Sequence, residues 1–355
     1  MKLLKIFLLL NTLLMATLLN AQNKPYTFVD IHSHNVLPSY LDYLKKYDAL
    51  LEEGFPLPKW DVQKHLEMMK QQNIGYTILT MPAPQLYHGS TEENAKAIRQ
   101  YNEETAAIAS QYPQRFGFCA SLPLPNVAAA IEEAKYAFET LHTNGIKLAT
   151  NSNGQYLGSP ELEPLMEVLN QYGAVIILHP HKPVPINENL LTDIPLAAYE
   201  YLAETTRTVV NLIVHNVPSR YPNIKFVIPH CGSFLPLELP RLEKIHPIMM
   251  QFGLMNPIDW GRNLENFYYD LAGGLTDSSL DALLSITTPE HLLYGSDYPY
   301  VNENGVKNTF ENTLNVLKNN PKTSIHLHNI LKNNTLKLLG KLDNIIVSES
   351  SQRRK

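Results

Sequence analysis

Eight short apolar runs constrain the fold of this chain most strongly. Each run is rich in Val, Ile, Phe and Tyr, and each is followed by a stretch with helical spacing. Continuous apolar strands that alternate with helices are typical of a parallel sheet covered on its outer face. Eight such units predict a single α/β domain, a (β/α)₈ barrel of the TIM type. The runs cover residues 27–32, 75–80, 115–121, 145–149, 174–179, 224–229, 267–271 and 291–295.

The segments between the runs predict outer helices and two long connections. Helices are expected after a cap at Asp61 and over residues 91–110, 126–144, 160–172, 305–318 and 324–340. The long connections, 35–60 and 180–223, leave the carboxyl ends of strands, where barrel active sites are built. The second contains a further helix around 199–214. Both connections are candidates for the walls and lid of a pocket, and for the first one plain packing is an equal alternative.

The two ends of the chain differ from the predicted barrel. Residues 1–21 combine a basic start, an apolar run over 6–19 and a short polar end, which is typical of a secretory signal cleaved after Ala21. An uncleaved anchor is the alternative, but the run is shorter than the roughly 20 residues that span a bilayer. We therefore predict an exported protein, periplasmic or secreted, that is not inserted in the membrane after signal removal. The barrel is expected over 22–341 and a polar tail over 342–355.

Charge and cysteine content restrict the partners and the redox chemistry. The chain has 29 Lys and Arg residues against 34 Asp and Glu residues, which gives a formal charge of −5. Nucleic-acid binding would need a basic stripe, so a nucleic-acid partner is not expected. Cys119 and Cys231 each lie at the end of an apolar run, where a buried thiol is the common role. A disulfide between them is allowed but not indicated.

Side chains that can bind a metal follow four of the predicted strands. The first strand ends in His32 and His34, and residues two apart on a strand project from the same face. The fifth ends at His179, the sixth at His230 and the eighth at Asp297. Because the carboxyl ends of barrel strands converge on one axis, we expect these five side chains to be neighbours. The sequence therefore predicts a metal site at the barrel mouth.

Three imidazoles and one carboxylate, from His32, His34, His179 and Asp297, would leave one position on the ion for water. Such a donor set suits zinc, and Mn, Fe or Co remain open from ligand type alone. A bound ion would bring the pKa of its water towards about 7. His230 is the predicted general acid or base, with Asp297 as a second catalytic group. A fifth ligand or a structural hydrogen-bonding residue are the alternatives for His230.

Two further residues near these strand ends have more than one interpretation. His181 follows Pro180, where the strand has ended, so we expect it to support a ligand rather than to bind the ion. Lys147 lies on the fourth predicted strand, where a carbamylated lysine could bridge two metals. A lone barrel lysine is more often an ion-pair partner, so one ion is favoured over two.

The chain resembles the amidohydrolase superfamily. The resemblance rests on DIHSH, GIKLATNSNGQYLGSPELEPLMEVLNQYGAVIILHP, PHCGSFLP, FYYDLAG and LLYGSDYP, and it extends over about residues 29–340. The pattern is similar to the amidohydrolase 2 branch, which contains aminocarboxymuconate-semialdehyde decarboxylase and related non-oxidative decarboxylases. It implies a TIM-type barrel and one divalent ion, usually zinc. It also implies that the ligands are His32, His34, His179 and Asp297 and that His230 is catalytic.

The resemblance also bears on substrate binding and on a possible homodimer. In the decarboxylase, an arginine eleven residues after the catalytic histidine reaches a neighbouring subunit and binds the substrate carboxylate, and Arg241 has this spacing from His230. A guanidinium suits a carboxylate. The alternative for Arg241 is an ion pair on a helix surface, with Glu238 or Glu243.

The first long connection departs from the pattern of that decarboxylase. It contains lysines but no arginine, so the same dicarboxylic substrate is not expected. Its Tyr and Trp content instead favours an aromatic or otherwise flat, less charged molecule. Trp60 in this connection, and Tyr156 in the motif that follows the fourth strand, are candidate substrate-binding residues.

Three functions fit these residues. The first is decarboxylation of a small carboxylic acid, possibly aromatic, by metal-bound water and His230 with no organic cofactor. The second is hydrolysis of a lactone, ester or amide at the same site. The third is a non-catalytic binding protein on a retained barrel, which the complete ligand set disfavours. The resemblance favours the first.

Overall fold

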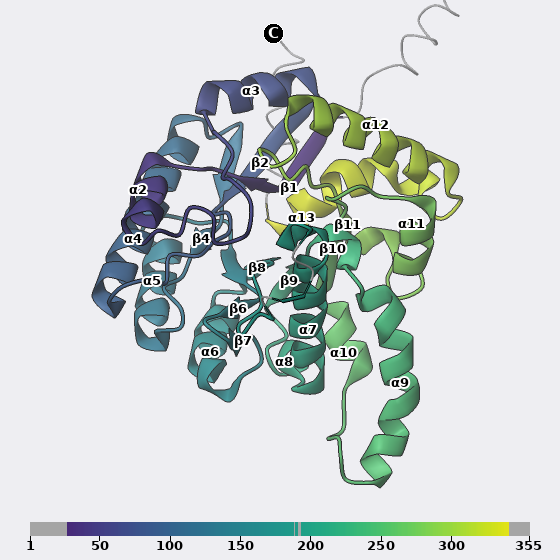
Figure 1. The fold of residues 1–355 in the computed structure, drawn as a ribbon. Helices are drawn as coiled ribbons and strands as arrows, with labels where there is room; N and C mark the ends of the chain where they lie inside the picture. The colour runs from purple at the N-terminus through teal and green to yellow at the C-terminus, as the bar shows by residue number, and fades with distance from the viewer. Residues whose placement is uncertain (1–26, 188, 191–192, 341–355) are drawn as a thin grey trace, which may run out of the picture.

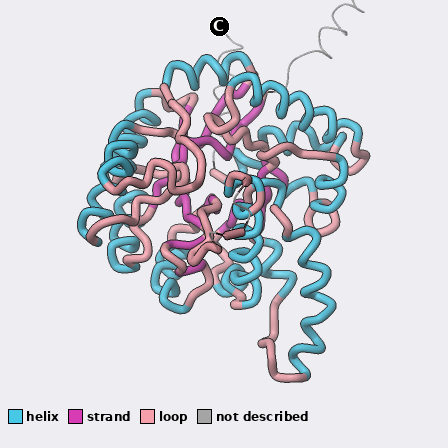
Figure 2. Tube along the Cα trace, viewed as in Figure 1, coloured by secondary structure: helices cyan, strands magenta, loops and turns pink. Residues whose placement is uncertain are grey.

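The computed structural model describes residues 27–187, 189–190 and 193–340. Within these ranges the strands form a central ring and the helices surround it (Figure 1, Figure 2). The predicted signal segment, residues 1–21, and the predicted tail, residues 342–355, lie outside the described residues. None of the helices in the described ranges combines the length and the apolar character that crossing a bilayer requires.

All eight apolar runs contain a strand, and every pairing between these strands is parallel. The third run is divided in two by Cys119. The strands are β1 (Phe28–His34), β2 (Ile74–Thr80), β3 (Phe116–Phe118), β4 (Ala120–Ser121), β5 (Ile146–Ala149), β8 (Val175–His179), β9 (Lys225–Ile228), β10 (Phe267–Asp270) and β11 (Leu292–Leu293). A short antiparallel hairpin, β6 (Asn151–Ser152) and β7 (Gln155–Tyr156), follows β5.

Backbone hydrogen bonds close the ring of strands. The order β1-β2-β3 continues into β4-β5-β8-β9-β10-β11 through Cys119, whose N–H donates to Leu79 O at 3.0 Å. On the other side, Ile31 N donates to Tyr294 O at 3.0 Å, which joins β1 to the segment after β11. The prediction of a TIM-type barrel is therefore confirmed, and the carboxyl ends of its strands share one mouth.

The helices cover the outer face of the ring (Figure 2). They are α2 (Pro38–Lys46), α3 (Val62–Gln71), α4 (Thr91–Gln111), α5 (Val127–Glu139), α6 (Glu163–Gln171), α7 (Glu200–Val214), α8 (Val217–Arg220), α9 (Leu235–Gln251), α10 (Trp260–Glu265), α11 (Asp277–Leu283), α12 (Glu303–Asn319) and α13 (Asn334–Leu338). The predicted cap at Asp61 is present, because its carboxylate accepts hydrogen bonds from Gln63 N and Lys64 N. Such a cap satisfies amide groups that have no partner within the helix.

Two predicted helices differ from the structure at their ends. The helix expected over 126–144 stops at Glu139, because His142 takes a left-handed backbone conformation with φ of 53°, before Gly145 is reached. The helix expected over 324–340 is divided into a 3₁₀ turn at Ser324–His326, a π-helical turn at Asn329–Asn333 and α13. Periodicity alone does not detect such changes of helix type.

Candidate metal centre

A β-bulge in β1 directs both histidines of this strand towards the barrel mouth. Ile31 packs in a buried cluster formed by several strands, so strict alternation would send His32 and His34 to the opposite face. Between Asp30 and Ser33, however, β1 contains one residue more than the paired segment of β2. An extra residue of this kind bends the strand and reverses the alternation. The bulge therefore brings the two imidazoles to the side where the other strand ends meet.

His32, His34 and His179 form one buried group. Their possible ligand atoms all lie within 4.8 Å of one another. The ring centroids of His34 and His179 are 4.7 Å apart, and those of His32 and His179 are 5.5 Å apart. His179 is the last residue of β8, and its Nδ1 lies 2.8 Å from Pro180 O, which turns Nε2 towards the group.

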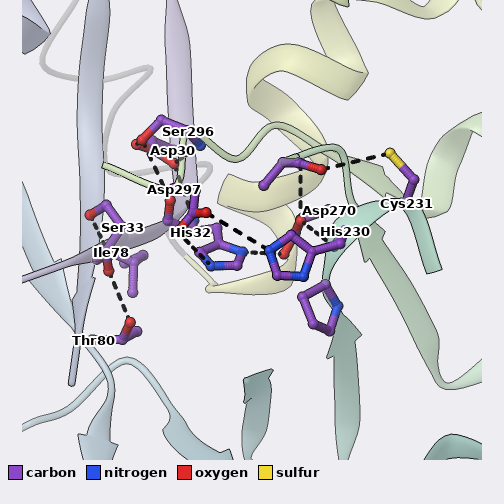
Figure 3. Close-up of polar contacts among 12 residues, drawn as sticks. Asp30, His32, Ser33, Ile78, Thr80, His230, Cys231, Asp270, Ser296 and Asp297 are labelled. Atoms are coloured by element: carbon purple, nitrogen blue, oxygen red, sulfur yellow. Dashed lines mark hydrogen bonds and ion pairs between the residues drawn. The ribbon is translucent and has the colours of Figure 1, made fainter. Parts of the chain in front are cut away.

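Asp297 reaches these imidazoles because the segment after β11 is tied to β1. Ser296 Oγ donates a hydrogen bond to Asp30 Oδ2 at 2.6 Å, and Asp297 N donates to His32 O at 2.8 Å (Figure 3). Asp297 Oδ1 consequently lies 3.3 Å from His34 Nε2 and 3.6 Å from His32 Nε2. The structure thus brings together all four residues predicted as ligands.

A divalent ion fits this donor set. His32 Nδ1 lies 2.8 Å from Asp270 Oδ2, and His34 Nδ1 lies 2.9 Å from Thr80 Oγ1. The Thr80 hydroxyl donates to Ser33 O, so it accepts from His34 Nδ1–H. The Nε2 atoms of both histidines are buried, with no hydrogen-bond partner among the described residues. Outer hydrogen bonds that orient imidazoles and leave the inner nitrogens unsatisfied are characteristic of metal sites.

The protonation of the imidazoles is consistent with metal binding. Burial lowers the pKa of His34 to about 4 and that of His179 well below its usual value, so both rings are neutral near pH 7. Burial acts in the same direction on His32, but the Asp270 carboxylate outweighs it and raises the pKa of His32 to about 9. Because metal binding releases protons from its ligands, an ion at this position would displace the proton of His32.

His230 lies on the turn after β9, across from Asp297 (Figure 3). Its Nε2 is 3.9 Å from Asp297 Oδ2, and its backbone N–H donates to Asp270 Oδ1 at 3.0 Å. Burial alone would raise the pKa of the Asp297 carboxyl, but His230 and His34 hold that pKa well below its usual value. An imidazole and a carboxylate this close can both reach one molecule bound beside them and exchange a proton with it.

The turns that carry these two groups are strained. His230, Cys231, Ser233 and Asp297 all have φ between 56° and 58°, a region that residues other than glycine rarely adopt. Each such residue costs about 1–3 kcal/mol, and strain of this kind clusters at functional sites. Gly273 accommodates the imidazole, because a Cβ at this position would lie 3.1 Å from His230 Cδ2.

One cavity of about 840 Å³ opens over these groups. His179, His230 and Asp297 lie in its lining, together with side chains from α7, α9, α11 and the long connections. The lining residues are Phe55, Ala83, His179, Pro195, Ala197, Ala198, Tyr201, Leu202, His230, Cys231, Ser233, Pro236, Leu237, Ala272, Gly273, Gly274, Thr276, Ser278, Ser279, Ala282, Asp297 and Tyr300. The lining includes no lysine and no arginine from the described part of the chain.

Three aromatic residues form a wall of the cavity beside the imidazoles, and sequence reasoning did not assign them to the site. The ring centroid of Phe55 lies 5.6 Å from that of Tyr300 and 6.3 Å from that of Tyr201. Tyr300 in turn lies 5.5 Å from the ring of His34. Phe55 belongs to the first long connection, as expected for a pocket wall. Tyr300 follows Asp297 by three residues, and that spacing was the only sequence signal available.

The structure places Trp60, Tyr156 and Arg241 away from the cavity lining. Trp60 Nε1 donates a hydrogen bond to His65 Nδ1 at 3.0 Å. The Tyr156 hydroxyl donates to Glu204 Oε2 at 2.7 Å. Arg241 is exposed on α9, and no ion pair joins it to Glu238 or Glu243 within the described part of the chain. The structure therefore shows no contact between these three residues and the metal centre.

Lys147, His181 and the two cysteines are all buried. Lys147 lies on β5, where burial lowers its pKa to about 8, and it is not part of the imidazole group. His181 pairs through Nδ1 with Glu53, so it is bound to the first long connection. No disulfide joins Cys119 to Cys231.

Comparison with known proteins connects this geometry to a group of enzymes. Decarboxylase yanB of Aspergillus niger is 34% identical over 285 residues, which cover 77% of this chain and 77% of the relative. The 6-methylsalicylic acid decarboxylase of Penicillium expansum is 31% identical over 276 residues, which cover 76% of this chain and 84% of the relative.

Solved structures show the same fold. The crystal structure of a protein described as amidohydrolase II matches with a TM-score of 0.81 at 30% identity, covering 88% of this chain and 100% of the other. The family model for amidohydrolases matches residues 29–341. The resemblance drawn from the sequence motifs is therefore confirmed, and this chain belongs to the amidohydrolase family.

Proposed function

We propose that this protein is a metal-dependent decarboxylase of a small aromatic carboxylic acid. The main support for the proposal is a cavity lined by two residues of the metal centre, His179 and Asp297, by the His230 imidazole and by an aromatic wall. The relatives reported above are named decarboxylases, one of them of 6-methylsalicylic acid, which supports this reaction over hydrolysis.

Four residues would hold the ion: His32, His34, His179 and Asp297. We propose zinc, because three imidazole nitrogens and one carboxylate oxygen suit it, and manganese, iron and cobalt are the competitors for the same donors. When bound, a divalent ion supplies positive charge that holds the carboxylate or a neighbouring oxygen of the substrate. No organic cofactor takes part in the proposed reaction.

The residues around the centre would position the ring and move one proton. Phe55 and Tyr300, whose ring centroids lie 5.6 Å apart, would pack against the aromatic ring of the substrate. A protonated His230 would deliver the proton of Nε2 to the ring carbon that carries the carboxylate and would itself become neutral, with Asp297 Oδ2 3.9 Å from that nitrogen. The new C–H bond replaces the bond to the carboxylate, whose electrons return to the ring as CO₂ leaves. A hydroxyl group ortho or para to that carbon would assist protonation.

A substrate screen tests this proposal directly. Salicylic, 6-methylsalicylic and 2,6-dihydroxybenzoic acids are offered to the zinc-loaded and to the manganese-loaded protein, and CO₂ release is measured. Phenyl acetate and γ-butyrolactone are offered in parallel, and acid release is measured. The proposal expects CO₂ from at least one aromatic acid and no acid above background. Acid release from the ester or lactone, with no CO₂ from any aromatic acid, would establish the hydrolase alternative instead.

We further propose that the protein is exported and that two chains pair through α9. The basic and apolar start of the chain supports export. The α9 arm, α9 with the loop to residue 254, extends from the barrel in Figure 1 and exposes Ile248, Phe252 and Leu254 near its far end, the last two more than 70% exposed. A cluster of exposed apolar side chains is typical of a protein interface. Pairing through this arm would place Arg241 within reach of the second chain, as the resemblance implies.

A further inference from the structure

The cavity has an outer part that the proposed reaction does not use. The reacting groups lie at its inner end, on the strand ends. The outer wall is the name used here for the apolar residues that line the rest, which come from the 3₁₀ turn η2 (Leu196–Ala198) and from α7, α9 and α11. Its members are Pro195, Ala197, Ala198, Leu202, Pro236, Leu237 and Ala282.

The volume of the cavity exceeds what a simple benzoic acid fills. A cavity of about 150 Å³ is enough to hold a benzene ring. The cavity here has a volume of about 840 Å³, so a ring seated beside Tyr300 leaves most of the space to something else. Because the outer wall is continuous with the metal centre in one cavity, the remaining space is adjacent to the bound ring.

The outer wall is suited to an apolar group and not to a charged one. The charged or readily charged side chains of the lining are His179, His230 and Asp297, all at the inner end. Of the basic residues on the same segments, Lys182 pairs with Glu52 and Arg207 pairs with Glu204. Arg241, on α9, has no ion pair among the described residues, but it lies outside the cavity lining. A carboxylate against this wall would find no side chain of opposite charge in the lining of the outer part.

We propose that the outer wall is a binding site for an apolar substituent, so that the substrate is an aromatic acid that carries an alkyl chain longer than a methyl group. This inference rests on the proposed function and specifies its substrate class. Ala198 and Ala282 provide space, and Leu202 and Leu237 provide apolar contact. Burying one methylene group is worth about a three- to fourfold gain in binding. The outer wall therefore favours substrates with a longer alkyl substituent.

The first test compares alkyl chains on one ring. Salicylic acids with a methyl, propyl or pentyl group are compared by kcat/KM, as the 4-, 5- and 6-substituted isomers. For at least one ring position, kcat/KM rises about tenfold from methyl to propyl, because two methylene groups are added. A flat or falling series at every ring position overturns the inference. A preference for the isomers that carry a second carboxyl group in place of the alkyl group overturns it as well.

The second test replaces a small residue of the outer wall by a large one, which would occupy the space proposed for the alkyl chain. Ala198 is exposed on η2, so Ala198→Trp adds bulk without disturbing the barrel core. In this variant the ratio of kcat/KM for the pentyl and methyl substrates falls to about one. Ala107→Trp, at an exposed alanine on α4 away from the cavity, retains the wild-type ratio. An unchanged ratio in Ala198→Trp shows that the chain does not lie against this wall.

A binding measurement separates the site from the reaction. Calorimetry with 3-methylphenol and 3-pentylphenol, which resemble the products, needs no turnover. If the pentyl compound binds more tightly to the wild type and Ala198→Trp abolishes this difference, the outer wall binds the alkyl chain. If no CO₂ is detected in the same experiments, only the decarboxylase proposal fails. CO₂ release together with equal binding of the two phenols overturns the outer wall alone.

Discussion

The metal centre depends on residues that hold the imidazoles from outside. Asp270 accepts from His32, and Thr80 accepts from His34, while both inner nitrogens remain available. Asp270 also accepts backbone hydrogen bonds from His230 and Ala272, so one carboxylate orients a proposed ligand and the proposed proton donor.

Asp270→Asn separates these two tasks. The amide oxygen can still accept the backbone hydrogen bonds, but its NH₂ group cannot accept from His32 Nδ1–H. We expect metal affinity to fall about 10- to 100-fold, as for other residues that support a ligand. Competition with a chelating dye measures the affinity, and circular dichroism checks the fold. A wild-type affinity would show that this hydrogen bond does not orient His32.

His230→Ala distinguishes a proton donor from a ligand. We expect this variant to keep its metal and to lose about 10²- to 10⁴-fold in kcat, the usual contribution of a general acid. Metal analysis beside a CO₂ assay measures both quantities. If the ion is lost together with the activity, His230 is a fifth ligand.

At the scale of residues, the sequence predicted the proposed metal ligands, but not the features that orient them, which are Asp270 and the bulge in β1. His32, His34, His179 and Asp297 were found because each lies at the end of an apolar run or within two residues after it. Asp270 lies one residue before the end of the run 267–271 and is the last residue of β10, so a search for metal-binding or acidic side chains at strand ends would have found it too. The bulge in β1 could not be predicted, because an extra residue in one strand is visible only in its pairing with the next.

Among the elements, the first long connection, residues 35–60, is held in place by contacts with other parts of the chain. Two of its residues, Glu52 and Glu53, are called here the acidic latch, and they bind residues at the barrel mouth. Glu52 binds Tyr87, His88 and Lys182. Glu53 is buried and pairs with His181, and it accepts from Lys182 N at 3.1 Å and from the Tyr201 hydroxyl at 2.8 Å. The latch thus holds Phe55, two residues on, against the cavity.

Glu53→Gln weakens the latch without changing its shape. The variant loses the negative charge that faces His181, so we expect about 1–3 kcal/mol less stability. Because Phe55 and Tyr201 lose their anchor, KM should rise more than kcat falls. Urea unfolding and steady-state kinetics measure these effects, with Glu67→Gln on the exposed face of α3 as the matched control. Equal stability in the two variants would contradict the role of the latch.

The latch also predicts a dependence of stability on pH. Burial opposes ionisation of Glu52, but His88, Lys182 and Tyr87 outweigh it and lower its pKa from 4.5 to about 2. A carboxyl with a lowered pKa stabilises the fold above its unfolded-state pKa, and this contribution is lost as the pH falls from about 4.5 towards 2. The stability difference between wild type and Glu52→Gln should therefore shrink over this interval in acid unfolding curves. A constant difference would show that Glu52 is not held as an anion.

The sequence predicted the strands correctly, but it did not predict which aromatic side chains of the first long connection face the cavity. Aromatic residues in the first connection were expected at the pocket, and Phe55 is there, whereas Trp60 contacts His65 instead. Composition indicates that a loop has aromatic residues, but which of them faces the cavity depends on the latch, whose partners come from distant parts of the chain.

At the scale of the molecule, barrel closure explains why residues far apart in sequence form one site. His32 and Asp297 belong to the two strand ends that close the ring, and Asp297 N bonds to His32 O. The repeated alternation of strand and helix was sufficient to predict this convergence. The sequence has no comparable pattern that would predict the exposed apolar residues of the α9 arm. Their exposure depends on which faces of α9 the neighbouring helices cover.

The α9 arm predicts the oligomeric state. Phe252 is 72% exposed there, and pairing of two chains would bury it. We expect the wild type to sediment as a dimer and Phe252→Asp as a monomer in analytical ultracentrifugation. Ile325→Asp, at a residue 82% exposed on another element, is the control and should remain dimeric. A monomeric wild type would exclude this interface.

The most direct test of the proposed metal-dependent reaction is a metal titration of the metal-free protein during decarboxylation of 6-methylsalicylic acid. We expect the rate of CO₂ release to rise linearly with added zinc or manganese and to reach its plateau at one ion per chain. Full activity without metal, or a plateau at two ions per chain, would contradict it.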